Sequence, residues 1–187
     1  MRTLATAEEF GAAIDEAMRP AVADPALREA VAASIRDAET ELRAEPSDSA
    51  EALSLRVGRF VLREEDLPIA ESIALAASTA VALLAPGVVV AAAVITAIGS
   101  FSTLAWKAWR KGARLSPREI TVLGLVKMHG PLSDEELVAL AGKADPALAP
   151  EAVASALASL GDVEMRDGDI VSLIRKDASG RLVARAV

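Results

Sequence analysis

The chain has 187 residues, a net charge of −7, one histidine and no cysteine. The lack of cysteine excludes disulfides and thiolate chemistry, and one histidine excludes a cluster of imidazole metal ligands. Aromatic residues make up 3% of the chain, so few rings are present to stack on nucleic-acid bases. An acidic chain of this length holds one domain or two small ones and does not bind DNA by bulk electrostatics.

The charges are distributed unevenly along the chain. Residues 1–71 have a net charge of −8, residues 72–106 have no charged side chain, residues 107–114 have +4 and residues 115–187 have −3. The mean hydropathy is +0.34, high for a soluble protein with 25% charged residues, because the apolar side chains are concentrated in the uncharged run. Arginine outnumbers lysine 15 to 5, which is typical of GC-rich bacterial genomes, so we expect a bacterial protein.

Three amphipathic helices are predicted in the acidic region 1–68. The first spans about 6–20 and starts with a capping box, and the second spans about 24–44 and starts with an Asp-Pro signal. The third spans about 47–64. We expect a helical bundle with a solvated acidic face, and the alternative is that this face docks a basic partner.

The uncharged run predicts an apolar helical hairpin over residues 69–106. As one helix the run would be roughly 52 Å long, which exceeds a bilayer core of about 30 Å. Pro86-Gly87 favours a turn and divides it into helices over 69–85 and 88–106. Each of these would be roughly 25–28 Å long.

This hairpin is interpreted in three ways, and all three stay open. Two tryptophans at its C-terminal edge and four cations in the following basic linker, 107–114, favour a hairpin inserted from the cytoplasmic face of a membrane. Its many small residues equally suit a hairpin buried in a soluble core, or one kept buried and released into a bilayer. The predicted membrane contacts are Val88, Val90, Ile95, Phe101, Trp106 and Trp109. The predicted head-group contacts are Lys107, Arg110, Lys111 and Arg114. The start of the chain shows no apolar secretory signal, which also favours the cytoplasm.

Residues 115–187 form a compact C-terminal module in which helical periodicity gives way to strand periodicity. Helices are predicted at 117–129, 134–141 and 150–160, each between a start signal and a glycine. The glycines that end them are Gly130, Gly142 and Gly161.

Strands are predicted after the third helix. Asp167-Gly168 predicts a two-residue turn between strands over 163–166 and 170–174. Ser179-Gly180 predicts a second turn before a last strand over 181–187.

Three short helices followed by a β-hairpin resemble a winged helix-turn-helix domain. The resemblance covers about residues 115–187 and lies in the order of the elements and in the transition from Gly161-Asp162-Val163 to Asp167-Gly168. It implies a third helix and a wing that bind DNA or a protein. Residues 150–160 contain no Arg, Lys, Asn or Gln, which disfavours DNA readout and favours a protein partner or self-association. The wing candidates for phosphate or partner contact are Arg166, Arg175, Lys176, Arg181 and Arg185.

No set of residues in the sequence predicts catalysis. His129 stands alone at a predicted helix end, no phosphate-binding glycine loop is present, and the carboxylates at 64–66 are typical of a solvated turn. We therefore expect no enzymatic activity, no cofactor and no metal site.

Together these patterns predict a mostly α protein with an amphipathic N-terminal region, a central apolar hairpin and a small α+β winged-helix domain. The leading hypothesis is a non-enzymatic bacterial adaptor or regulator that associates with a membrane through the hairpin and binds a protein partner through the winged helix. One alternative is a soluble, dimeric winged-helix regulator that binds DNA. Another is a membrane-perturbing effector with a releasable hairpin.

Overall fold

A computed structural model of the protein describes residues 4–5, 7–19, 25–44, 62–63, 67–83 and 92–185, and these are mostly helical. The helices are α1 (Ala7–Met18), α2 (Pro25–Ala44), α3 (Leu67–Ala82), α4 (Ala92–Arg110), α5 (Pro117–His129), α6 (Asp134–Ala144) and α7 (Pro150–Gly161). The strands are β1 (Leu4–Ala5), β2 (Leu62–Arg63), β3 (Val163–Glu164), β4 (Ile170–Val171), β5 (Ile174–Lys176) and β6 (Leu182–Ala184).

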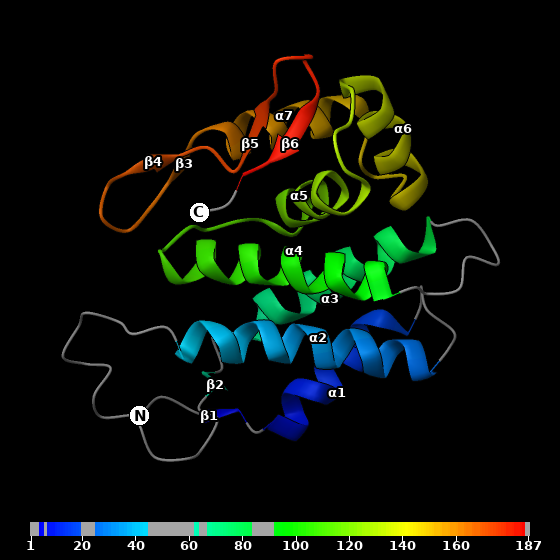
Figure 1. Cartoon of the computed structure of the whole chain (residues 1–187), viewed down its shortest axis with the longest axis vertical. Helices are drawn as coiled ribbons and strands as arrows, with labels where there is room; N and C mark the ends of the chain where they lie inside the picture. The colour runs from blue at the N-terminus through cyan, green and yellow to red at the C-terminus, as the bar shows by residue number, and fades with distance from the viewer. Residues whose placement is uncertain are drawn as a thin grey trace.

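The helices are stacked, and α5 lies between the two halves of the chain (Figure 1). α1 packs against α3, α2 packs against α4, and both α3 and α4 pack against α5. On its other side α5 contacts α6, α7 and β6. Buried side chains from α1 through to β6 form one continuous core, so the predicted N-terminal and C-terminal regions share their interior.

α5 occupies this central place because it is apolar on nearly all sides. Residues 122–126 are all buried, which leaves no face of the helix middle for solvent. A Cβ on Gly124 would lie 3.1 Å from the Phe101 ring and 3.4 Å from the Cβ of Ala76. A side chain at this position would therefore push apart the junction of α3, α4 and α5.

The apolar segment predicted as a hairpin is present as α3 and α4, with shifted bounds. α3 begins at Leu67, since Pro68 is tolerated in the first turn of a helix. α4 continues past Trp106 to Arg110, and Pro86-Gly87 lies outside the described residues. α3 and α4 contact each other less than α3 contacts α5 or α4 contacts α2. None of the described helices combines the length and the apolar character needed to cross a membrane.

Two of the three N-terminal helices that the sequence predicts are confirmed as α1 and α2. The third, predicted over about 47–64, falls largely outside the described residues, and the helix predicted at 62–63 is wrong. These two residues form β2, which pairs antiparallel with β1. A partner strand almost 60 residues away in the sequence overrides the local helical pattern.

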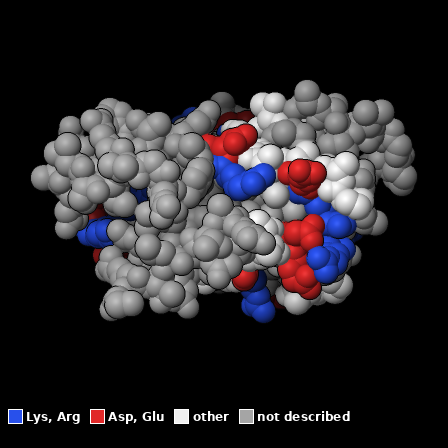
Figure 2. Space-filling model, turned by 90° about the horizontal axis from the view of Figure 1, so that it is seen from below, with Lys and Arg blue, Asp and Glu red and all other residues white. Residues whose placement is uncertain are grey.

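At this end of the molecule the visible acidic and basic side chains lie intermingled (Figure 2), and Asp15 pairs with both Arg19 and Arg28 at 2.7 Å.

The predicted starts of α5 and α6 are confirmed. Ser116 Oγ accepts from the Glu119 N–H at 3.3 Å, while the Glu119 carboxylate accepts from the Ser116 N–H at 2.6 Å. Ser133 and Glu136 form the same reciprocal pair at 3.1 and 2.7 Å. Both boxes satisfy backbone donors that a helix start otherwise leaves unpaired.

Two predicted helix ends are wrong, by three residues in α6 and by one residue in α7. α6 passes through Gly142 and ends at Ala144, and α7 includes Gly161. Neither glycine has the positive φ of a left-handed C-cap, whereas Gly130, which ends α5, has a φ of 78°.

Two antiparallel hairpins, β3–β4 and β5–β6, follow α7. In the first, Met165 N–H donates to the Asp169 carbonyl at 2.8 Å and Gly168 N–H donates to the Met165 carbonyl at 3.0 Å. The loop therefore has three residues, and the predicted two-residue turn is wrong. Gly168, with a φ of 87°, takes the left-handed position that this longer loop requires.

The second hairpin repeats this turn and confirms the one predicted at Ser179-Gly180. Asp177 N–H donates to the Arg181 carbonyl at 2.8 Å, and Gly180 has a φ of 78°. Leu132, between α5 and α6, exchanges backbone hydrogen bonds with Leu182 at 2.7 and 3.2 Å. The segment that precedes α6 thus joins the edge of the β5–β6 hairpin.

Candidate functional site

The candidate site is the outer surface of the C-terminal unit, built from α7 and the two hairpins. α7 buries Val153, Ala156 and Leu160 against the core. Glu151 is the one charged residue of the helix, and the rest of its exposed face carries small, uncharged side chains. The exposed residues of this face are Ala154, Ser155, Ala158 and Ser159. We call these four residues the α7 face.

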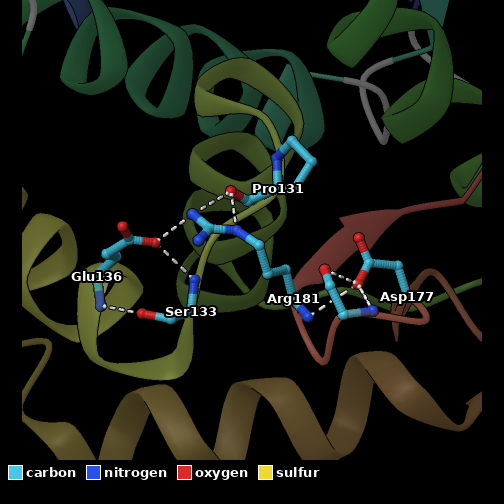
Figure 3. A network of polar contacts seen from close by, with 6 residues as sticks. Pro131, Ser133, Glu136, Asp177 and Arg181 are labelled. Atoms are coloured by element: carbon cyan, nitrogen blue, oxygen red, sulfur yellow. Dashed lines mark hydrogen bonds and ion pairs between the residues drawn. The ribbon is translucent and has the colours of Figure 1, made fainter.

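The side chain of Arg181, predicted as a wing contact, forms its hydrogen bonds and its ion pair within the C-terminal unit (Figure 3). Its Nε and Nη2 donate to the Pro131 carbonyl at 3.0 and 2.8 Å, and Nη2 also lies 2.6 Å from Glu136 Oε2. Its backbone N–H donates to Asp177 Oδ1 at 3.0 Å. Arg181 therefore ties the hairpin turn to the start of α6.

The carboxylates of this network are stabilised in their charged form. The hydrogen bond from the Ser133 N–H and the nearby Arg181 charge lower the pKa of Glu136. Hydrogen bonds from the Ser179 hydroxyl and from the Arg181 N–H lower the pKa of Asp177. The pairing of Arg181 with Pro131 and Glu136 could not be predicted from the sequence, because these residues lie 50 and 45 residues away along the chain.

The other wing candidates fall into two groups. Lys176 pairs with Asp134 at 2.7 Å, so it also links the β5–β6 hairpin to the start of α6. Arg166, Arg175 and Arg185 are exposed, and within the described parts of the chain their side chains have no hydrogen bond or ion pair.

The predicted basic linker begins inside a helix. Lys107 and Arg110 lie in the last turn of α4, where cations complement the helix dipole. The helix ends in a Schellman motif, in which Gly112 N–H donates to the Trp109 carbonyl at 2.9 Å and Gly112 has a φ of 96°. The Arg114 guanidinium stacks 4.5 Å from the centroid of the Trp109 ring.

The predicted basic linker and the first of the predicted wing cations, which are far apart in the sequence, meet at the turn after α4. Arg166 N–H donates to the Lys111 carbonyl at 2.8 Å, so the turn after α4 is fixed to the tip of the β3–β4 hairpin. The contact is close: a Cβ on Gly112 would lie 2.6 Å from the Cβ of Arg166.

The predicted membrane contacts differ in how far they are buried in the structure. Phe101 and Trp106 are buried in the core, with 0% and 1% of their surface exposed, and Trp109 is half-buried. In this conformation neither of the first two side chains can reach lipid. Ile95 lies on α4, and Val88 and Val90 lie outside the described residues.

A cleft of about 350 Å³ opens at the C-terminal end of α7. Its lining comes from the turn after α4, from the end of α7 and from β3. The lining residues are Gly112, Arg114, Leu115, Ser159, Asp162, Val163, Glu164 and Met165. This cleft could not be predicted from the sequence, because its walls come from segments more than 40 residues apart. We call it the α7 cleft.

A second cleft, of about 600 Å³, lies between α2 and α4 and is lined mainly by small side chains such as Ala33, Ser34, Gly99 and Ser100.

The structure places His129 in the last turn of α5, while residues 64–66 fall outside the described parts. Among the described residues, no group of three or more His, Asp or Glu side chains is arranged to hold a metal ion.

No protein-family model, curated protein or solved structure matches this chain. Its function is therefore proposed from the geometry of the C-terminal unit.

Proposed function

We propose that the chain is a non-catalytic adaptor or regulator whose C-terminal unit is a winged helix that binds a protein partner through the α7 face. The order of elements supports a winged-helix arrangement. Three helices are followed by the β5–β6 hairpin, and the strand bridge at Leu132 joins that hairpin between the first two helices. The β3–β4 hairpin contains the Asp167-Gly168 turn at which the sequence resemblance placed the wing. We assign the wing to β5–β6 instead, so β3–β4 is an additional element between α7 and the wing.

The observation that carries the proposal is the lack of cations where a nucleic acid would dock. α7 has no Lys or Arg, and the start of α6 carries Asp134, Glu135 and Glu136, which repel phosphate. Two of the five wing cations, Lys176 and Arg181, are paired with these α6 carboxylates. The chain also has no Asn or Gln, the side chains that read adenine in the major groove.

Site-specific cross-linking tests this function. A photo-reactive amino acid at Ala158, on the α7 face, is expected to give a discrete protein adduct in native host cells. The same amino acid at Ala12, which is exposed on α1, serves as the matched control. Ala154→Arg is expected to abolish the Ala158 adduct, because a long charged side chain blocks close approach to a face of small residues. Equal adducts from both positions would contradict the proposal.

A DNA-binding regulator is the second candidate, because the exposed Arg175 and Arg185 could contact phosphates. Duplex binding that weakens steeply with salt and is lost on Arg175→Glu would favour it. Membrane contacts by Phe101 and Trp106 would require these two side chains to leave the core, so the adaptor proposal does not depend on such contacts.

A further inference from the structure

We propose that three cations around the turn after α4 receive carboxylates from an acidic segment of the protein partner. The three residues are Lys111, Arg114 and Arg166, and we call them the basic cluster. This inference rests on the proposed function and adds to it the chemical class of the partner segment. It follows from the way the backbone holds these cations together, from their lack of ion pairs and from the orientation of Arg114.

The backbone brings the basic cluster together from two distant parts of the chain. Gly112 N–H donates to the Trp109 carbonyl at 2.9 Å, which orders the turn that carries Lys111. Arg166 N–H donates to the Lys111 carbonyl at 2.8 Å, so these two cations are neighbours across a backbone contact. A partner would therefore meet a cluster that needs little ordering.

The fold does not neutralise the basic cluster. All three residues are exposed, and among the described residues none of them forms an ion pair. Like charges on neighbouring segments repel each other, so the contact between Arg166 and Lys111 carries an electrostatic cost in the free protein. An anion bound between them would remove this cost.

Arg114 is oriented to bind a carboxylate. Its guanidinium lies 4.5 Å from the centroid of the Trp109 ring, and a stacked guanidinium keeps the N–H donors at its edge available. These donors match the two oxygens of a carboxylate. Ser159 of the α7 face lines the same cleft as Arg114. A partner on the α7 face can therefore reach the basic cluster.

The carboxylates near the cluster favour a peptide over an extended anionic surface. Asp167 and Asp169 are exposed in the loop that carries Arg166, and Asp162 and Glu164 line the α7 cleft. A bilayer or a DNA duplex presents many phosphates at once, and these would meet the carboxylates together with the cations. The acidic side chains of a peptide can contact the cations one at a time.

Titration of the full-length protein tests the inference. The probe is the capped peptide Ala-Glu-Glu-Glu-Ala, and the control probe carries glutamine in place of glutamate. The glutamate peptide is expected to shift the amide resonances of Lys111, Gly112 and Arg166 in NMR spectra, and added salt is expected to weaken its binding. Equal shifts with both peptides would overturn the inference. Binding to phosphatidylglycerol vesicles without any binding of the peptide would also overturn it.

Variants give the test a sign. Lys111→Gln, Arg114→Gln and Arg166→Gln are each expected to weaken binding about two- to fivefold, as for exposed ion pairs. Glu164→Gln is expected to strengthen it, because it removes a nearby negative charge. Lys143→Gln, at an exposed cation in the last turn of α6, is the matched control. If this control weakens binding as much as Arg166→Gln, the peptide follows the overall charge and the assignment fails.

Stability separates a binding role of the cluster from a structural one. Arg166→Gln is expected to leave the urea midpoint unchanged or to raise it, because the hydrogen bond to Lys111 comes from the backbone and a repulsion is removed. A lower midpoint would mean that the Arg166 guanidinium stabilises the fold, and it would overturn the inference.

Two further outcomes separate this inference from the proposed function. Peptide binding at the basic cluster without any adduct from Ala158 would keep the cluster and contradict the α7 face. An adduct from Ala158 in a protein that does not bind the glutamate peptide would keep the proposed function and overturn the inference.

Discussion

Arg181 is a surface arginine whose role is structural. Its side chain is 42% exposed, yet it joins the hairpin turn, the segment before α6 and the α6 capping box. The capping boxes themselves could be predicted from the sequence because their partners are three residues apart. The partners of Arg181 could not, because the fold brings distant segments together.

Removing the Arg181 guanidinium should therefore destabilise the C-terminal unit. Arg181→Met keeps most of the apolar stem but loses both hydrogen bonds to the Pro131 carbonyl. We expect the free energy of unfolding to fall by about 1–2 kcal/mol, the usual value for exposed bonds from a charged donor. Urea unfolding measures this change. Arg175→Met is the control, and an equal loss there would show that Arg181 acts only through general surface charge.

The same network makes stability depend on pH. The pKa of Glu136 lies below its ordinary value of 4.5, and that of Asp177 lies below 3.8. Each carboxyl binds its proton more weakly in the folded protein, so its stabilising effect is complete above the ordinary pKa and is lost as the pH falls through the lowered value. Urea unfolding between pH 3 and pH 6 should show this loss, and Glu136→Gln should flatten the curve. An unchanged pH dependence in Glu136→Gln would exclude this carboxyl as a source.

Two glycines, one in the turn after α4 and one inside α6, are expected to respond to alanine in opposite directions. Gly112 has a φ of 96°, and an added Cβ would lie 2.6 Å from the Cβ of Arg166 and 2.9 Å from its backbone nitrogen. Gly112→Ala should therefore destabilise the protein by about 2 kcal/mol or more, from strain and from displacement of the β3–β4 hairpin.

Gly142 provides the matched control for Gly112. It lies inside α6, is exposed, and has no atom within 4 Å of its Cβ position. Gly142→Ala should stabilise the protein by up to about 1 kcal/mol, because alanine is the better helix former. Thermal unfolding of the two variants compares these effects, and a shift of the same sign in both would contradict the geometry at Gly112.

Elements with strong local signals were predictable, and elements set by distant partners were not. α1, α2 and α5 follow from periodicity, caps and glycine or proline signals near their ends. β2 does not, since its strand conformation depends on β1. The α7 cleft was not predictable either, because its residues come from separate segments that meet only when Arg166 contacts the turn after α4.

The apolar middle of the chain and the C-terminal unit share one core and are not independent parts. The sequence places a boundary near residue 115, but α5 packs on α3 and α4 with one side and on α6 and α7 with the other. Apolar character on all sides of a helix fits a membrane span and a core helix alike, so the sequence alone left this choice open. Phe101 and Trp106 lie in the core that α5 joins to the C-terminal unit.

A cavity in α4 should therefore weaken the C-terminal unit as well. Phe101 is fully buried and its ring reaches Gly124 of α5, so Phe101→Ala should lower the free energy of unfolding by about 3–5 kcal/mol. Ile170→Ala, at a side chain 70% exposed on β4, should change it by less than about 0.5 kcal/mol. Native-state hydrogen exchange can follow α4 and α7 separately. One shared core requires the slowest amides of both helices to lose protection together in Phe101→Ala, whereas loss confined to α4 would mean that the C-terminal unit folds on its own.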